Sequence, residues 1–184
     1  MGGRRDGFPY VERALAVEAA RREVDRTFRN VTRRHDEADP ATAAWLAAVR
    51  RFHAALALAY PAAFWEDVER LAAGDPAGLD SAIGFLEADP IFFRSGYVKA
   101  DLTRYAKRVP HDEDQRRRLE AVILSVVDRR DGREFRHYCR LARRIAGWHL
   151  RGELEARLKA GDPAVRRRAR WALEAIGEPD PEPG

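Results

Sequence analysis

Cysteine is nearly absent from this chain of 184 residues: only Cys139 is present, so neither an internal disulfide nor a cysteine-rich zinc site is available to it. Long apolar runs are also missing. The densest one, Ala54–Tyr60, is far shorter than the roughly 18 residues of a membrane-spanning helix. The first residues include Arg4, Arg5 and Asp6 and contain no apolar core of an export signal, so we expect a cytoplasmic protein. A chain of this length with 45% hydrophobic residues can fold without cross-links.

The familiar catalytic motifs are missing as well. The chain has no phosphate-binding loop, no Gly-x-Gly-x-x-Gly dinucleotide pattern, no Gly-x-Ser-x-Gly elbow and no His-Glu-x-x-His zinc motif. His137 and Cys139 stand two residues apart, which turns them about 200° from one another on a helix, a poor geometry for a shared metal ion. These absences favour a non-catalytic protein, and we predict no catalytic residue, no metal site and no cofactor.

Lysine is scarce, and the basic residues are unevenly placed. Of the 34 basic side chains only three are lysines, and the other 31 are arginines. Residues 1–95 carry 13 basic and 15 acidic side chains, whereas residues 96–177 carry 21 and 12, a balance of +9 against +4 for the whole chain. The excess of arginine over lysine has two possible explanations, codon bias or function. A basic half attracts acidic partners, which include nucleic acid, anionic lipid and acidic protein surfaces.

Helical periodicity runs through almost the whole sequence. The most strand-like stretch, Ala121–Val127, lies inside a longer helical pattern and is interpreted as buried helix. We therefore predict an all-α domain over residues 10–177, with a near-neutral half at 10–95 and a basic half at 96–177. A disordered N-terminus at 1–9 and an acidic, proline-rich tail at 178–184 flank it. About nine helices are expected: Tyr10–His35, Pro40–Tyr60, Pro61–Ala73, Pro76–Ala88, Gly96–Arg108, Asp112–Arg130, Arg133–Ala146, Trp148–Ala160 and Pro163–Ile176.

Asp-Pro pairs mark the expected helix starts. The aspartate accepts a free backbone N–H at the helix N-terminus, and proline needs no donor at the first helical position. Gly74 and Gly161 precede two of the pairs, where a left-handed residue would end the previous helix. The last pair in the following list precedes a poor helix interior, 91–96, for which we expect a turn or a loop. The four pairs are Asp39-Pro40, Asp75-Pro76, Asp162-Pro163 and Asp89-Pro90.

The chain contains an internal repeat at an offset of 87 residues. Residues 70–88 and 157–175 are identical at 11 of 19 aligned positions. Turn chemistry accounts for the shared Gly-Asp-Pro, but the matches continue through the following helix at Ala82, Leu86 and Glu87. The offset is close to two units of the roughly 40–47-residue HEAT or armadillo period.

The run Gly161-Asp162-Pro163-Ala164-Val165-Arg166, with the small and apolar residues up to Gly177, resembles the second helix of a HEAT-like repeat of the phycobilisome-lyase type. The clearest match covers 161–177, and residues 74–88 are a degenerate echo in which Gly78, Leu79 and Asp80 replace the Val-Arg-Arg of the later copy. The resemblance implies a right-handed α-α superhelix of antiparallel helical hairpins with a concave face. It implies an architecture and no chemistry.

Basic residues on one helical face are the sharpest functional pattern. Five arginines between 133 and 144 fall within an arc of about 100°, and apolar residues occupy the opposite side. Guanidinium groups at these spacings repel one another and suit phosphates or carboxylates. The alternative is a solvated face whose arginines pair with acids such as Asp128 or Asp131. The candidate residues for binding an anionic partner are Arg133, Arg136, Arg140, Arg143, Arg144, Arg104, Lys107 and Arg108.

Aromatic residues fit a core better than a ligand site. Tyr97, Leu102 and Tyr105 share one helical face, which indicates a core stripe, although aromatic rings beside cations could also stack nucleobases. The four tryptophans are interpreted as core residues or wedges between repeats, with at least one partly exposed. They are Trp45, Trp65, Trp148 and Trp171.

We predict a non-catalytic helical-repeat binding or scaffold module whose basic C-terminal half engages an acidic partner. The first alternative is a nucleic-acid-binding protein, including one of the HEAT-like DNA-repair type, onto which no residue can be aligned. The second is a small-molecule enzyme or carrier with a helical cleft. Steep weakening of binding by salt would indicate nucleic acid, and a deep pocket with buried carboxyl or imidazole groups would indicate the second alternative.

Overall fold

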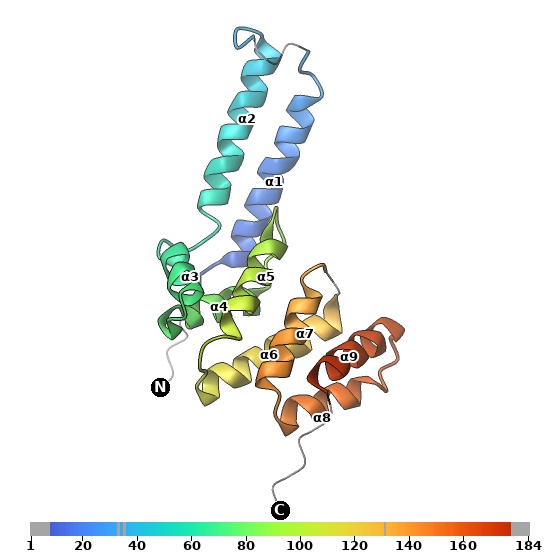
Figure 1. Cartoon of the computed structure of the whole chain (residues 1–184). Coiled ribbons are helices and arrows are strands. Elements are labelled where there is room, and N and C mark those ends of the chain that lie inside the picture. The colour runs from blue at the N-terminus through green and yellow to red at the C-terminus, as the bar shows by residue number, and fades with distance from the viewer. Residues whose placement is uncertain (1–7, 33, 35, 131, 178–184) are drawn as a thin grey trace, which may run out of the picture. The chain divides into compact units, whose positions relative to one another are not determined.

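The computed structural model describes residues 8–177 except 33, 35 and 131. Within these residues every regular element is a helix and no strand occurs, so the prediction of an all-α fold is confirmed (Figure 1). The predictions for 1–9 and 178–184 fall, apart from Phe8 and Pro9, outside the described residues. The elements are α1 (Tyr10–Phe28), α2 (Pro40–Ala57), α3 (Phe64–Ala72), the 3-10 helix η1 (Pro76–Gly78), α4 (Leu79–Ala88), α5 (Ser95–Ala106), α6 (Glu113–Arg129), α7 (Phe135–Ile145), α8 (Trp148–Arg157) and α9 (Pro163–Ile176).

Three of the four Asp-Pro pairs start helices as predicted. Asp39 and Asp162 accept a backbone N–H of the first turn of α2 and α9 at 3.0 and 2.7 Å, and Asp75 does the same for η1 at 2.9 Å. Each bond satisfies one of the donors that a helix N-terminus leaves free. Asp89 starts no helix: it has a φ of +44°, and the residues after Pro90 stay irregular up to α5.

Two predictions about helix ends were wrong. Helix α1 stops at Phe28, seven residues before the expected end at His35. Gly161 was expected to be left-handed, but the positive φ values among the described glycines are those of Gly74 (+92°) and Gly177 (+78°). Helix α8 already ends at Arg157, so the turn after it reverses the chain before residue 161 and needs no left-handed residue there.

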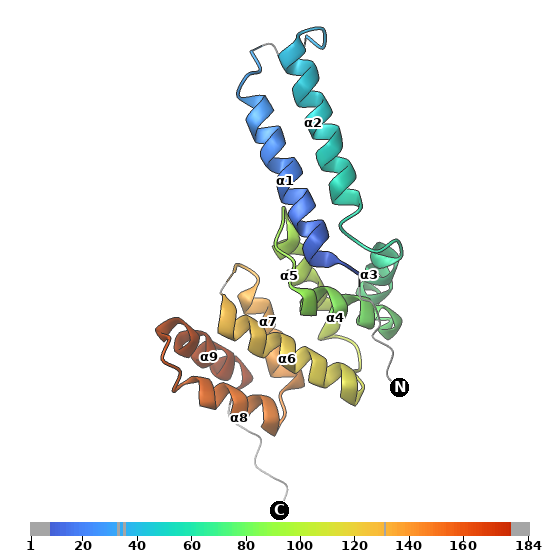
Figure 2. The same ribbon diagram turned by 180° about the vertical axis from the view of Figure 1, so that it is seen from behind.

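The described residues group into two compact units, and the single domain expected over 10–177 stays a prediction. One unit comprises the described part of Met1–Phe64 with Ala88–Ser95, and the other comprises Trp65–Glu87 with the described part of Gly96–Gly184. The first unit is built on the antiparallel pair of α1 and α2 (Figures 1 and 2). Fully buried Val17 and Ala48 lie in its core.

The second unit contains the basic half of the chain. Helix α7 packs on α6 and on α9, and α9 packs on α8. Helix α6 lies behind α7 in Figure 1 and in front of it in Figure 2, so α7 has α6 on one side and keeps its opposite face open. The apolar residues of α6 and α7, such as Ile123 and Leu141, are buried. Across all described residues, no helix is apolar over a length that could traverse a bilayer.

The two copies of the internal repeat start their second helices differently. The later copy goes directly from Asp162 into α9, whereas the earlier copy passes through η1 before α4 begins. The earlier copy also has a close backbone approach, because a Cβ atom at Gly78 would lie 2.0 Å from the carbonyl oxygen of Asp67 in α3. Glycine, which has no Cβ atom, is therefore the residue that this approach permits.

Candidate anion-binding surface on α5 and α7

Helix α7 has one buried and one exposed face, as its sequence predicts. Phe135, Tyr138, Leu141 and Ile145 are all at least 95% buried. The five arginines of the predicted face are all exposed; Arg133 precedes the first turn, and the others belong to the helix. The amphipathic pattern therefore orients α7 with its apolar side on α6 and α9 and its cationic side in solvent.

None of these five arginines has a carboxylate of a described residue within salt-bridge distance. Other arginines of the same unit are paired: Arg118 with Glu87 at 2.8 Å, and Arg157 with Asp128 at 2.8 Å. Asp128, one of the two acids considered as partners for the face, is thus already engaged; the other, Asp131, lies outside the described residues. Glu134, next to Arg133 in the chain, pairs with Arg130 at 2.5 Å.

His137 lies among several cations on this side of α7. Arg136 donates from Nε to the ring Nε2 of His137 at 3.4 Å. Burial is the largest cause that lowers the pKa of His137 below its usual value, and four cations lower it further: Arg136, Arg140, Arg104 and Lys107. Two of these cations come from α7, and two come from the C-terminal end of α5 and the residue after it. The structure therefore brings together, around one imidazole, cations of two segments that lie about 30 positions apart in the sequence.

The other four predicted binding residues are not among the cations that lower the pKa of His137. Arg144 lowers the pKa of His111 as a secondary cause after burial, and Nε2 of His111 lies 2.8 Å from the carbonyl oxygen of Ala106 in α5. Arg108 is exposed, and no described interaction links it to α7. Arg143 and Arg144 lie in the last turn of α7, where cations also stabilise the helix dipole.

Arg104 differs from the others because it is held in place. It pairs with Asp101 at 2.8 Å, donates to the Tyr105 hydroxyl at 3.1 Å, and its guanidinium lies 5.0 Å from the centre of the Tyr105 ring. Tyr97 was predicted to share a core stripe with Tyr105, but 61% of it is exposed. The helical face is instead turned so that Leu102 and Ala106 fill the core.

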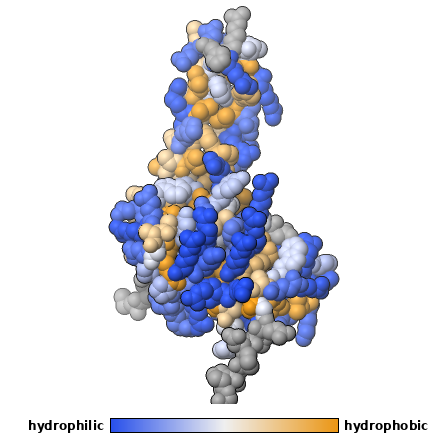
Figure 3. All heavy atoms as spheres, in the orientation of Figure 1, coloured by the Kyte–Doolittle hydropathy of each residue, from blue (hydrophilic) through white to orange (hydrophobic). Residues whose placement is uncertain are grey.

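We call the eight residues the α5–α7 basic cluster. Figure 3 shows strongly hydrophilic side chains gathered over α5 and α7. The cluster consists of Arg104, Lys107, Arg108, Arg133, Arg136, Arg140, Arg143 and Arg144.

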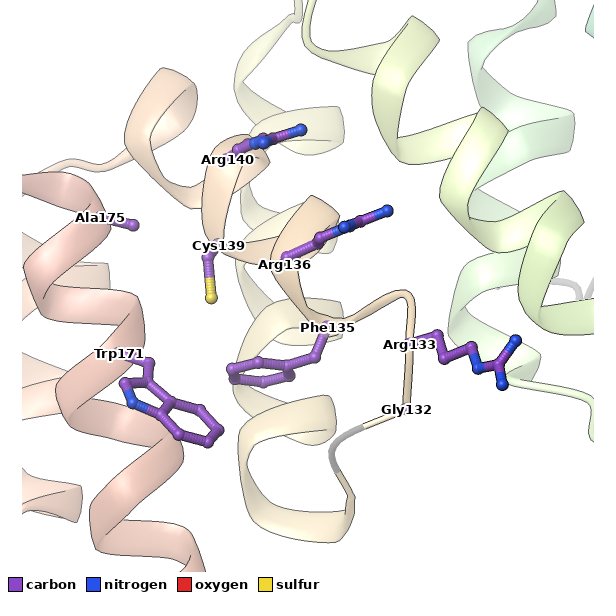
Figure 4. Close-up of a pocket in the computed structure, with 8 residues that line it drawn as sticks. All are labelled: Gly132, Arg133, Phe135, Arg136, Cys139, Arg140, Trp171 and Ala175. Carbon is purple, nitrogen blue, oxygen red and sulfur yellow. The ribbon is translucent and has the colours of Figure 1, made fainter.

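A groove of about 530 Å³ lies between α7 and α9. Phe135 and Trp171 line it with their ring centres 6.1 Å apart; Phe135 is buried, and Trp171 keeps 42% of its surface exposed (Figure 4). A third residue, Arg167, holds its guanidinium 5.3 Å from the centre of the Trp171 ring. The groove therefore has an aromatic floor and borders the α5–α7 basic cluster. Its lining consists of Gly132, Arg133, Phe135, Arg136, Cys139, Arg140, Trp171 and Ala175.

The exposure of the tryptophans corrects the expectation that they are core residues or wedges between repeats. Trp148 is 88% exposed, Trp65 49% and Trp171 42%, so three of the four lie at the surface. Trp148 begins α8 and lies beside a second, smaller pocket of about 200 Å³. The sequence analysis missed this pocket.

The second pocket has a buried carboxylate in its wall. Glu120 of α6 is 2% exposed, and its Oε2 lies 3.0 Å from Nδ1 of His149. Its Oε1 has no hydrogen-bond donor among the described residues, and Nη1 of Arg116 lies 3.7 Å from it. The sequence contained one signal of this buried carboxylate: Glu120 is an acid on the apolar side of a helix, between Leu119 and Val122.

Metal and thiol chemistry find no support in the described residues. No group of three or more histidine, cysteine, aspartate or glutamate side chains is placed to hold a metal ion there. Cys139 is 8% exposed, and burial raises the pKa of its thiol to about 11, which keeps it protonated and unreactive at neutral pH. Ser81, one of the three serines, donates its hydroxyl proton to Asp67.

Comparisons with protein-family models, with curated proteins and with solved structures find no match to this chain. The function is therefore inferred from the geometry of these surfaces.

Proposed function

We propose that this protein is a non-catalytic helical binding module that engages an acidic partner through the α5–α7 basic cluster. The observation that carries the proposal is the set of five exposed arginines on and before α7 that have no carboxylate partner among the described residues. Arginines kept this close without counter-charges repel one another. An anionic ligand that contacts several of them relieves this repulsion, which favours the complex.

The surroundings of α7 support a binding role over a merely solvated face. On neighbouring helices, Arg118 and Arg157 are neutralised by acids of the same chain. His137 is half-buried in the middle of the cluster and is flanked by cations from α5 as well as α7. The cations of two helices thus converge on one surface, and bidentate guanidinium groups suit phosphate and carboxylate oxygens.

We also propose that the helices form a HEAT-like superhelix and that the protein acts in the cytoplasm. The HEAT-like arrangement is supported by the packing of α8 on α9, by the Asp162 cap that starts α9, and by the echo of this pattern at Asp75. The cytoplasmic location rests on the sequence alone.

The direct test replaces Arg136, Arg140 and Arg143 by Gln in one variant. A matched control replaces Arg22, Arg29 and Arg50, which are exposed on the α1–α2 pair and change the net charge equally. We expect the cluster variant to bind both a polyglutamate peptide and an oligonucleotide at least about 10-fold more weakly at low salt, because three charge-assisted contacts are lost. The control should bind within about 2-fold of the wild type. Equal losses in the two variants would show that net charge, and not the cluster, attracts anions.

A small-molecule site is a second candidate, favoured by the buried Oε1 of Glu120, which has no hydrogen-bond donor among the described residues, in the wall of the pocket beside Trp148 and His149. The volume of this pocket, about 200 Å³, is below the roughly 300–1,000 Å³ that is usual for small-molecule sites. Soaking or screening for ligands whose binding changes Trp148 fluorescence tests this candidate.

A further inference from the structure

We infer that the acidic partner is a single-stranded nucleic acid, with phosphates on the α5–α7 basic cluster and bases in the groove between α7 and α9. This inference rests on the proposed function and adds the ligand class. A positively charged track beside exposed aromatic rings is the arrangement that binds single strands without strong sequence preference.

The groove supplies the stacking surface. Trp171 is 42% exposed although it lies in the middle of α9, and Phe135 faces it at 6.1 Å with its planes tilted by 55°. The Arg167 guanidinium lies over the Trp171 ring, 5.3 Å from its centre, and adds a cation at this surface. The groove has a volume of about 530 Å³, which can take flat aromatic rings, and its wall also includes three small residues, Gly132, Cys139 and Ala175.

The arginines supply the backbone contacts on the adjoining surface. Figure 4 shows that the guanidinium groups of Arg133, Arg136 and Arg140 extend from the α7 side away from Trp171, whereas the Phe135 ring points toward Trp171. Arg133, Arg136 and Arg140 line the groove and belong to the cluster, so the two surfaces share these three residues. A strand along α7 can therefore hold its phosphates on one side and turn its bases to the other.

The spacing along α7 suits a repeating anion. Arg136, Arg140 and Arg144 are four residues apart, which places successive guanidinium groups about 6 Å apart along the helix axis. Successive phosphates of an extended single strand have a comparable step. An acidic peptide could use the arginines but has no ring for Trp171, and in a duplex the bases are already paired and stacked inside the helix.

The experiment measures the affinity of the full chain for three labelled probes by fluorescence anisotropy at about 50 mM salt. The probes are an oligothymidylate of about 15 nucleotides, a DNA duplex of the same length and a polyglutamate peptide. Trp171→Leu removes the stacking ring. The matched control, Trp148→Leu, removes an even more exposed tryptophan outside the groove.

We expect Trp171→Leu to weaken oligothymidylate binding roughly 5- to 100-fold and to change binding of the duplex and the peptide by less than about 2-fold. Trp148→Leu should leave all three affinities within about 2-fold. Trp171→Phe keeps an aromatic face, so it should retain oligothymidylate binding within about 5-fold. If circular dichroism shows that Trp171→Leu does not fold, the Trp171→Phe variant still tests whether residue 171 stacks on a base. Loss of binding in a folded Trp171→Phe variant equal to that in Trp171→Leu would contradict stacking.

The failure of this inference is distinguishable from the failure of the proposed function. If oligothymidylate binding is unchanged in Trp171→Leu but falls in the cluster variant with three Gln substitutions, the groove assignment is overturned and the anion-binding function stands. Tighter binding of polyglutamate than of oligothymidylate likewise overturns the ligand class and indicates an acidic protein partner. If the cluster variant binds every anion as the wild type does, both proposals are wrong.

Discussion

His137 is the residue whose protonation is most directly linked to the α5–α7 basic cluster. Its ring is half-buried, and the cations that face it from α7 and from α5 and the residue after it keep their charge throughout the range in which histidine titrates. Both burial and these charges disfavour the imidazolium form, so the pKa of His137 is lowered from 6.5. An anion bound on the cluster would oppose this effect and favour protonation.

We predict that the pKa of His137, followed by NMR, lies below 6.5 in the free protein and rises when an anionic ligand binds or when Arg136 and Arg140 are replaced by Gln. Because the folded-state pKa is lower than the unfolded-state value, the unfolded chain takes up the proton first. The contribution of His137 to stability is therefore complete above pH 6.5 and decreases as the pH falls below it. His137→Gln should remove this part of the pH dependence of the unfolding free energy. An unshifted pKa in the arginine variants would separate His137 from the cluster.

Gly78 is a second residue with a specific structural role, because it lies against the backbone of α3. The substitution Gly78→Ala places a Cβ atom 2.0 Å from the Asp67 carbonyl oxygen. We predict a loss of about 1–3 kcal/mol or more in the free energy of unfolding, measured in urea, since the backbone must move to accept the methyl group.

Gly84 provides the matched control within α4. A Cβ atom at Gly84 meets nothing within 4 Å, so Gly84→Ala should stabilise the helix by about 0.5–1 kcal/mol. Opposite signs for the two substitutions are expected; equal effects would show that the approach of residue 78 to α3 is looser than the structure indicates.

At the scale of elements, α6 and α7 use arginine in different ways. On α6 two of the arginines are paired with acids, Arg116 with Glu113 at 2.5 Å and Arg118 with Glu87 at 2.8 Å. Helix α7 contains no acid within its bounds, and the neighbouring acids Asp128 and Glu134 pair with other arginines. Among the described residues, α7 and the turn before it therefore present five arginines without a carboxylate partner, whereas two arginines of α6 are compensated. Exposed pairs such as those on α6 contribute little stability, typically about 0–1 kcal/mol.

The start of α9 depends on a single side chain. Asp162 accepts the Ala164 N–H at 2.7 Å, and Pro163 occupies the first helical position. We predict that Asp162→Ala lowers the free energy of unfolding by about 0.5–2 kcal/mol, whereas Asp162→Asn, which keeps the acceptor, stays within a few tenths of the wild type. Chemical denaturation checks both. If Asn is as destabilising as Ala, the carboxylate charge at the helix N-terminus matters more than the hydrogen bond.

At the scale of the whole molecule, the net charge of +4 conceals a balance of +9 in residues 96–177. The cluster is therefore a local property that the total charge understates. Because like charges three or four residues apart on a helix cost roughly 0.2–0.5 kcal/mol per pair, the free protein is less stable at low salt than its packing alone would make it.

We predict that replacing Arg136, Arg140 and Arg143 by Gln raises the melting temperature at low salt by about 2–4 °C, which corresponds to roughly 1 kcal/mol for a chain of this size. Salt screens the same repulsion, so added salt should stabilise the wild type more than this variant. Calorimetry at low and high salt measures both. A lower melting temperature in the variant would mean that these arginines stabilise the fold through contacts within the chain.

The sequence by itself determined the all-helical fold, the starts of two helices and the buried face of α7. Asp-Pro pairs identified the starts of α2 and α9, because the cap is a local interaction between residues two or three positions apart. The 3.6-residue period of α7 likewise separated Leu141 and Ile145 from the arginines, since burial of one face follows from the pattern. The loop after Asp89 was recognisable from its poor helix interior for the same local reason.

Only the tertiary structure decided which charges find partners. Asp128 was available to α7 by sequence but pairs with Arg157, a residue of α8, because helix packing and not sequence distance brings these groups together. The same holds for the cations around His137, for the close approach of Gly78 to α3 and for the exposure of Trp171. Each depends on contacts between helices that are distant in the chain, and periodicity within a single helix contains no information about them.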